Sequence, residues 1–197
     1  MSKNKNQVFN VPNTLAFTRV LMAPVMFWVI ITPEFFTEQG IHITWVYYLA
    51  ALLFVLASTT DFFDGYIARM LDQTTLLGKI LDPLADKMLT IGAFLALMIM
   101  GDANAWAIYI IIVRELFITG LRTVAVAEGI DVSASWAGKV KTVVQMIAIG
   151  FLIMHWSLDE YLLFSVDDAL LWFAVVLTIY SGAEYIIGFS RAFKGKE

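Results

Sequence analysis

Four aspartates lie close together in the first half of the chain, between two long apolar segments: Asp61, Asp64, Asp82 and Asp86. The first pair has i, i+3 spacing and the second has i, i+4 spacing, so on helices each pair lies on one face. Clustered carboxylates repel one another unless cations lie among them, and all-oxygen ligand sets suit Mg²⁺, Mn²⁺ or Ca²⁺. The spacing therefore predicts a divalent-cation site between two helix ends, joined by a short turn around Gln73–Gly78.

The residues beside the first aspartate pair favour a ligand that carries phosphate groups. Gly65 and Ala68 follow on the helical face of Asp61 and Asp64, and small residues let a ligand or another helix come close. Arg69 lies just beyond them and can hold a phosphate oxygen. The alternatives are that the aspartates are only interfacial and that the small residues serve helix packing alone.

The elements that must position these residues are apolar helices. Of the 197 residues, 60% are hydrophobic and only 15% are charged, far from the composition of a soluble domain. Apolar runs of roughly 20 residues, the length that spans a bilayer, recur along the chain. We expect an all-α integral membrane protein, a single domain over residues 1–197 with six transmembrane helices. The predicted spans are Leu15–Thr32, Ile43–Thr60 (its helix continuing to Arg69), Ile80–Met100, Ala105–Arg122, Gly138–His155 and Ala169–Gly188.

The start of the chain combines polar and apolar residues. Residues 1–13 are expected to form a polar tail that ends in a short interfacial segment. Asn13 and Thr14 are expected to cap the first helix. Arg19 lies early in the first span, where it is expected to snorkel to the surface or to face a polar cavity.

The distribution of basic residues predicts the orientation in the membrane. Lys and Arg fall at the termini, in the second and fourth loops and in the adjacent halves of the spans, whereas the first, third and fifth loops have none. Residues 189–197 form a basic C-terminal tail. By the positive-inside rule, both termini and the aspartates are on the cytoplasmic side. The chain has no cysteine, which excludes disulfides and thiolate chemistry.

A second cluster of charges is mainly basic. About nine apolar residues precede Arg114 and Glu115 in the fourth span, and Arg122 follows on nearly the same face, about 12 Å along the axis. Lys139 and Lys141 open the fifth span. Cations this deep indicate a functional site, and their number indicates a pocket for an anion such as a phosphate group. The alternatives are that the last three basic residues snorkel and that Arg114 only pairs with Glu115.

The pattern D-x2-D-G-x2-A-R-x8-G-x3-D-x3-D resembles the signature of the CDP-alcohol phosphatidyltransferase family at every fixed position. These positions are Asp61, Asp64, Gly65, Ala68, Arg69, Gly78, Asp82 and Asp86. The resemblance implies a homodimeric six-helix membrane enzyme with two divalent cations, Mg²⁺ or Mn²⁺, held by the four aspartates. It also implies that the first six signature residues bind the CDP part of CDP-diacylglycerol and that Asp86 deprotonates the attacking hydroxyl.

Three further segments are similar to the phosphatidylglycerophosphate synthase branch of that family: VPNTLAFTR (11–19), RELFITGLR (114–122) and SASWAGKVKT (133–142). This resemblance implies that glycerol 3-phosphate is the acceptor, giving phosphatidylglycerol phosphate and CMP in anionic phospholipid synthesis. It implies a multi-pass protein of a bacterial-type cytoplasmic membrane, without a nucleic-acid partner. Asn13 and Thr14 would lie near the donor headgroup, unless they only cap the helix. The implied contacts to the acceptor phosphate are Arg114, Arg122, Lys139 and Lys141.

Two alternatives remain open from the sequence. The first keeps the chemistry and changes the acceptor to inositol phosphate, to serine, or to phosphatidylglycerol, which would give cardiolipin. The basic cluster favours a phosphorylated acceptor over serine. The second is a divalent-cation transporter that uses the carboxylates as its ion site, although a transporter would more naturally spread its acids through the middle of the membrane.

Overall fold

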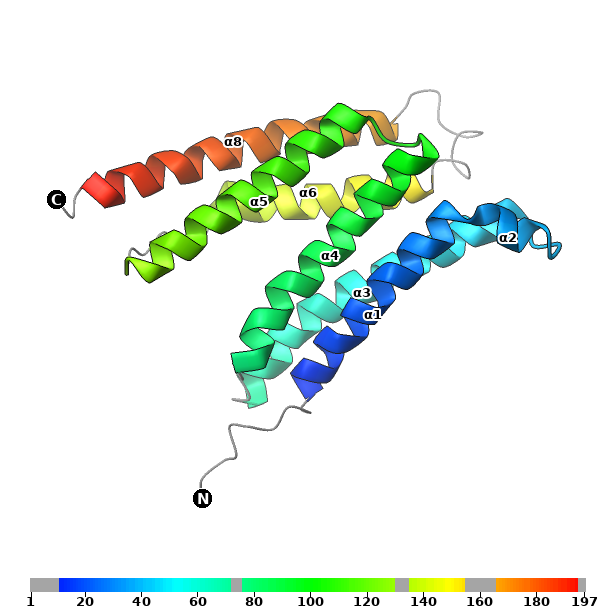
Figure 1. Ribbon diagram of the computed structural model, residues 1–197, viewed down its shortest axis with the longest axis horizontal. Helices are drawn as coiled ribbons and strands as arrows, with labels where there is room; N and C mark the ends of the chain where they lie inside the picture. Colours follow the sequence, from blue (N-terminus) through cyan, green and yellow to red (C-terminus); the bar gives the residue numbers. More distant parts are fainter. Residues whose placement is uncertain (1–10, 72–75, 130–134, 155–165, 195–197) are drawn as a thin grey trace, which may run out of the picture. The chain divides into compact units, whose positions relative to one another are not determined.

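The computed structural model describes residues 11–71, 76–129, 135–154 and 166–194, with side chains for these residues except 11–13, 61–71, 76–83 and 86 (Figure 1). Within these ranges every regular element is a helix. The helices are α1 (Val11–Ile31), α2 (Pro33–Thr37), α3 (Ile43–Leu71), α4 (Leu76–Met100), α5 (Ala105–Ala127), α6 (Trp136–Ile153) and α8 (Val166–Lys194). The prediction of an all-α protein is confirmed for the described part of the chain.

Four of these helices are long and apolar enough to cross a membrane. The apolar stretches are Thr14–Ile31 in α1, Ile43–Thr60 in α3, Trp136–Ile153 in α6 and Val166–Lys194 in α8. A shorter apolar stretch, Lys87–Met100, lies in α4. α5, with 23 residues, is longer than α1 and α6, but it contains Arg114, Glu115 and Arg122. Length and composition thus support an integral membrane protein, and the count of six spans stays a prediction.

Several helix ends differ from the predicted ones. α1 begins at Val11, so Asn13 lies inside its first turn and does not cap it. Pro12 is compatible with this earlier start because proline is tolerated in the first turn of a helix. Residues 33–42, expected as a loop, contain the short helix α2, which starts at Pro33 because a fixed φ suits the first helical position. Residues 1–10 of the expected tail lie outside the described residues.

The C-terminal residues 189–194 also differ from their prediction, because they continue α8 and do not form a separate tail. Arg191 and Lys194 occupy the last turn of the helix. Cations are favourable there because they interact with the unpaired carbonyl groups at a helix C-terminus. The basic end of the chain therefore stabilises the helix that it terminates.

The chain folds into two compact units. Unit 1 contains α1 to α4, and unit 2 contains α5, α8 and nearly all of α6. In unit 1, α1 packs against both α3 and α4. The start of α1, the end of α3 and the start of α4 lie at one end of this unit (Figure 1). The buried stripe of α1 recurs every three or four residues, as helical packing requires, and consists of Ala16, Arg19, Ala23, Met26 and Ile30.

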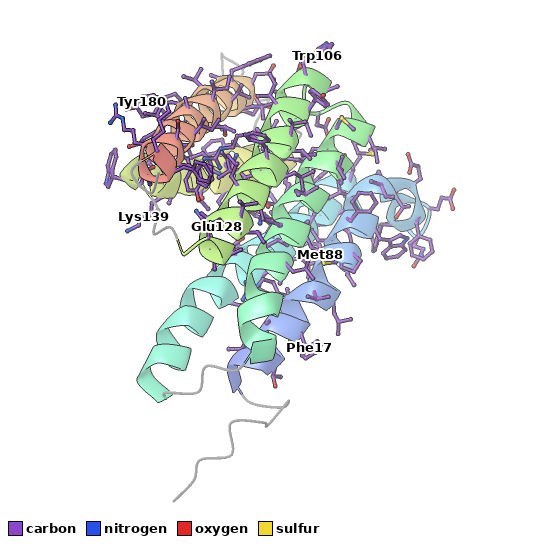
Figure 2. The ribbon with its side chains drawn as sticks, turned by 60° about the vertical axis from the view of Figure 1, so that its left-hand side comes forward. Phe17, Met88, Trp106, Glu128, Lys139 and Tyr180 are labelled. Atoms are coloured by element: carbon purple, nitrogen blue, oxygen red, sulfur yellow. The ribbon has the colours of Figure 1, made fainter. Side chains whose placement is uncertain are left out.

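In unit 2, α5 packs against α8, and polar side chains join α6 to both (Figures 1 and 2). The buried stripe of α8 begins as an apolar surface, with Leu171, Ala174 and Val175. Further along the helix, the same stripe becomes polar, with Thr178, Ser181 and Tyr185. Buried polar groups in an apolar helix need partners, so the change in the stripe marks the polar part of unit 2.

Candidate active site

The predicted aspartate pairs lie on two successive helices. Asp61 and Asp64 are in the last part of α3, and Asp82 and Asp86 are in the first part of α4. Gly65, Ala68 and Arg69 also lie on α3, and Gly78 lies on α4. The turn was expected around Gln73–Gly78, of which residues 72–75 lie outside the described residues. The side chains at all eight signature positions are also outside the part that the structure describes, so their contacts with CDP and cations stay predictions.

The two aspartate pairs lie at matching distances from the ends of their helices. Asp64 is seven residues before the end of α3 and Asp82 is six residues after the start of α4, which places both about 10 Å from a helix end. Asp61 and Asp86 are each ten residues inside their helices, or about 15 Å. Each helix therefore has one aspartate position nearer to its end and one farther from it, at the same end of unit 1.

This donor set fits a hard divalent cation. All four groups are carboxylates, and Mg²⁺ and Mn²⁺ prefer oxygen ligands. Among the residues with described side chains, which exclude these aspartates, no group of three or more His, Asp or Glu could hold a metal ion. That the four aspartates hold divalent cations stays a prediction, which their chemistry supports.

Arg19 contributes a cation to the core of unit 1. Its side chain is fully buried, within the stripe of α1 that packs against α3 and α4. The alternative that Arg19 snorkels to the surface is therefore wrong within this unit. The other acids of unit 1 with described side chains, Glu34, Glu38 and Asp102, follow the far ends of α1 and α4. α1 continues about 18 Å beyond Arg19 before it reaches that far end. Along the axis of α1, the aspartates of α3 and α4 are therefore the acids nearest to Arg19.

In unit 2, a four-residue group that we call the Arg114 cluster joins three helices. Arg114 Nη1 donates to Glu115 Oε1 at 3.2 Å, and Arg114 Nη2 donates to Ser181 Oγ of α8 at 2.9 Å. The ammonium group of Lys141, on α6, forms an ion pair with the same Glu115 oxygen. The Arg114–Glu115 ion pair is present, but it is not the only contact of Arg114, and the predicted role of Arg114 in an anion site stays a prediction. One carboxylate among two cations leaves an excess of positive charge, which favours an anionic ligand.

Neighbouring polar residues hold the Arg114 cluster in place. Ser181 Oγ donates to the carbonyl of Thr178 at 3.2 Å, and Gln145 Nε2 of α6 donates to Thr178 Oγ1 at 3.0 Å. Gly182 lets α8 approach Arg114, because a Cβ at this position would lie only 3.2 Å from Arg114 Cγ. These residues of α6 and α8 were not predicted as site residues. Their signal was polar side chains at helical spacing within spans that are otherwise apolar.

The other basic residues predicted to bind the acceptor phosphate differ in their exposure and in their contacts. Arg122 is exposed in unit 2, and its guanidinium carbon lies 5.8 Å from the centre of the Tyr185 ring, a cation–π contact. Lys141 is buried, so it does not snorkel. Lys139 is exposed at the start of α6 (Figure 2), and residues two apart on a helix point to nearly opposite sides. The structure thus brings Arg114 and Lys141 together on Glu115, and leaves Lys139 on another side of α6.

Comparison with known proteins adds to this geometry. A sequence profile described as CDP-alcohol phosphatidyltransferase matches residues 9–180 of the chain. The chain is 41% identical over 181 residues to the CDP-diacylglycerol–glycerol-3-phosphate 3-phosphatidyltransferase of Bacillus subtilis (strain 168), covering 90% of this chain and 94% of the relative. A relative of the same name from Rickettsia bellii (strain RML369-C) is 37% identical over 89% of this chain and 93% of the relative. Another from Escherichia coli (strain K12) is 34% identical over 90% of this chain and 93% of the relative. The profile match therefore includes the four aspartates and three of the four residues of the Arg114 cluster, Arg114, Glu115 and Lys141.

Proposed function

Because the chain belongs to the CDP-alcohol phosphatidyltransferase family, we propose that it transfers the phosphatidyl group of CDP-diacylglycerol to glycerol 3-phosphate. The products are phosphatidylglycerol phosphate and CMP. The observation that carries the proposal is the complete aspartate signature in a chain whose relatives from Bacillus subtilis, Rickettsia bellii and Escherichia coli bear this enzyme name. The family is generally metal-dependent, and we propose two Mg²⁺ or Mn²⁺ ions as the cations.

On the donor side, Asp61, Asp64 and Asp82 act chiefly as metal ligands. When bound, two divalent cations neutralise charge on the pyrophosphate and on the leaving CMP. Gly65 and Ala68 leave room for the nucleotide to approach α3. The other proposed donor contacts are Asn13, Thr14, Arg69 and Gly78. Thr14 is exposed, and α1 starts at the aspartate end of unit 1, which supports its place in this list.

Asp86 is the proposed general base. It takes the proton of the free primary hydroxyl of glycerol 3-phosphate, and the hydroxyl oxygen attacks the phosphorus that bears the diacylglycerol. A new P–O bond forms to the glycerol, the P–O bond to CMP breaks, and CMP leaves with the electron pair. No other reactant is needed to balance the step.

On the acceptor side, Arg114, Arg122, Lys139 and Lys141 are the proposed contacts to the phosphate of glycerol 3-phosphate. Arg114 is held by Ser181 and Glu115 and is therefore oriented before the ligand binds. Lys141 also neutralises Glu115, which would otherwise repel the phosphate.

The finer architecture also belongs to the proposal. We propose a single domain with six membrane spans, both termini and the active site on the cytoplasmic side of a bacterial-type membrane, and assembly as a homodimer. CDP-diacylglycerol then enters from the inner leaflet with its tails in lipid, and glycerol 3-phosphate arrives from the cytoplasm. The positive-inside distribution of Lys and Arg supports this orientation.

A panel of acceptors tests the function. Purified protein in mixed micelles with CDP-diacylglycerol and Mg²⁺ is given glycerol 3-phosphate, inositol phosphate, serine or phosphatidylglycerol, and lipid product and CMP are measured. Glycerol 3-phosphate should give phosphatidylglycerol phosphate with equimolar CMP. Product from another acceptor alone would refute the proposed acceptor and keep the reaction class. Metal uptake into vesicles without CMP release would instead favour the transporter.

Asp86→Asn tests the base. The variant should lose turnover because an amide does not accept the hydroxyl proton, while circular dichroism and elution volume stay unchanged. Asp168→Asn, at an exposed acid of α8, is the matched control and should keep normal activity. Normal turnover in Asp86→Asn would rule out Asp86 as the base.

A further inference from the structure

Two buried donor groups of unit 2 have no hydrogen-bond partner in the described part of the chain. One is the hydroxyl of Tyr185, a residue only 6% exposed, and the other is Nε of Arg114. Buried polar groups are almost always paired, by protein, water or ligand. These two buried donors are therefore available to a ligand that offers hydrogen-bond acceptors.

Both groups belong to the interface of α5 and α8. Arg114 contacts Ser181 and Gly182, and Tyr185 lies about one turn further along α8, on the same buried stripe. The guanidinium of Arg122, about two turns beyond Arg114 on α5, lies against the ring of Tyr185. Tyr185 therefore contacts Arg122 and lies about one helical turn from the residues of α8 that contact Arg114.

The chemistry of these groups specifies the kind of partner. An Arg Nε–H can only donate, so the partner must offer acceptor atoms. The nearby carboxylate of Glu115 is already bonded by Arg114 and Lys141. The two guanidinium groups close by favour a partner that also carries negative charge. A phosphate group supplies several acceptor oxygens together with negative charge, whereas a metal cation or an acyl chain supplies neither.

We propose that Tyr185 is a further acceptor-binding residue, whose hydroxyl donates a hydrogen bond to the phosphate of the phosphorylated alcohol. This inference rests on the proposed function and adds α8 to the acceptor site. Tyr185 lies beyond residues 9–180, which match the family profile, so the family resemblance does not assign it. Ser181 and Gly182 contact Arg114, and Tyr185 follows them on the same buried stripe of α8.

Tyr185→Phe tests the proposal, because it removes only the hydroxyl and keeps the ring under Arg122. The KM for glycerol 3-phosphate should rise about tenfold or more, as expected for a hydrogen bond to a charged group. The KM for CDP-diacylglycerol should not change. Tyr180→Phe is the matched control on the same helix, since Tyr180 is 62% exposed (Figure 2), and both of its KM values should stay at the wild-type level.

Thermal unfolding separates this role from a structural one. Without substrate, Tyr185→Phe should unfold at the wild-type temperature or slightly higher, because the hydroxyl that it removes has no partner there. The increase in unfolding temperature that saturating glycerol 3-phosphate produces should be smaller than in the wild type. A lower unfolding temperature with an unchanged KM would overturn the proposal and leave Tyr185 a packing residue.

The acceptor 3-hydroxypropyl phosphate, which lacks the C2 hydroxyl, identifies the contacted group. Tyr185→Phe should lose the same factor in kcat/KM with this acceptor and with glycerol 3-phosphate. A loss confined to glycerol 3-phosphate would overturn the phosphate contact. If the wild type used only another phosphorylated acceptor, the proposed function would fail and the same comparison would be made with that acceptor. Activity with serine alone would overturn both.

Discussion

Gly182 lets α8 approach Arg114, and its replacement by alanine should displace that side chain. An added Cβ would lie 3.2 Å from Arg114 Cγ and 3.3 Å from Nε, closer than the optimum of about 3.5–4.0 Å between carbon atoms. Arg114 would have to move by a few tenths of an ångström, which should disturb its 2.9 Å hydrogen bond to Ser181 Oγ. Gly182→Ala should therefore disturb the Arg114 cluster with a single methyl group.

Two opposing effects set the size of the change. Alanine in place of glycine inside a helix adds about 0.5–1 kcal/mol of stability. Loss of a hydrogen bond to a charged group costs about 1.5–3 kcal/mol. The net loss for Gly182→Ala is then about 0.5–2.5 kcal/mol. Gly120→Ala on α5 is the matched control, because nothing lies within 4 Å of its added Cβ. This variant should show only the gain in helix stability of about 0.5–1 kcal/mol.

Thermal unfolding in detergent and acceptor kinetics measure both variants. At about 2–4 °C per kcal/mol for a chain of this size, Gly120→Ala should raise the Tm by a few degrees and Gly182→Ala should lower it. The KM for glycerol 3-phosphate should rise several-fold in Gly182→Ala alone. Equal Tm gains in both variants, with equal KM values, would refute the contact between Gly182 and Arg114.

Two further predictions concern buried charges. Glu115→Gln leaves the buried ammonium of Lys141 without its carboxylate and should lower the free energy of unfolding by about 3 kcal/mol. The control Glu184→Gln, at an exposed acid of α8, should change the free energy of unfolding little. Equal losses in both variants would contradict the Glu115–Lys141 pair. Arg19→Met should cost about 3–5 kcal/mol without divalent cations and less with Mn²⁺, because a bound cation then compensates the nearby carboxylates. The same loss with and without Mn²⁺ would show that Arg19 does not balance them.

Much of the architecture depends only on neighbours along the chain and was therefore predictable. Hydrophobic length and helical spacing are local properties, and the structure has a helix in every predicted span. Locality also puts Asp61 and Asp64 on one helix and Asp82 and Asp86 on the next. The errors are at helix ends, where the start of α1 and the end of α8 depend on terminal interactions worth little energy.

By itself, the sequence determined the class of protein, its helices and the residue types of both clusters. Only the tertiary structure decided which side chains meet: Glu115 pairs with Lys141, 26 positions away, and Arg114 contacts Ser181, 67 positions away. The same holds for Arg19 and Tyr185, whose burial no local pattern indicates. In a helix that is apolar on nearly every side, the hydrophobic pattern does not specify which face turns inward. Packing against neighbouring helices sets that rotation, and with it the contacts of each polar residue.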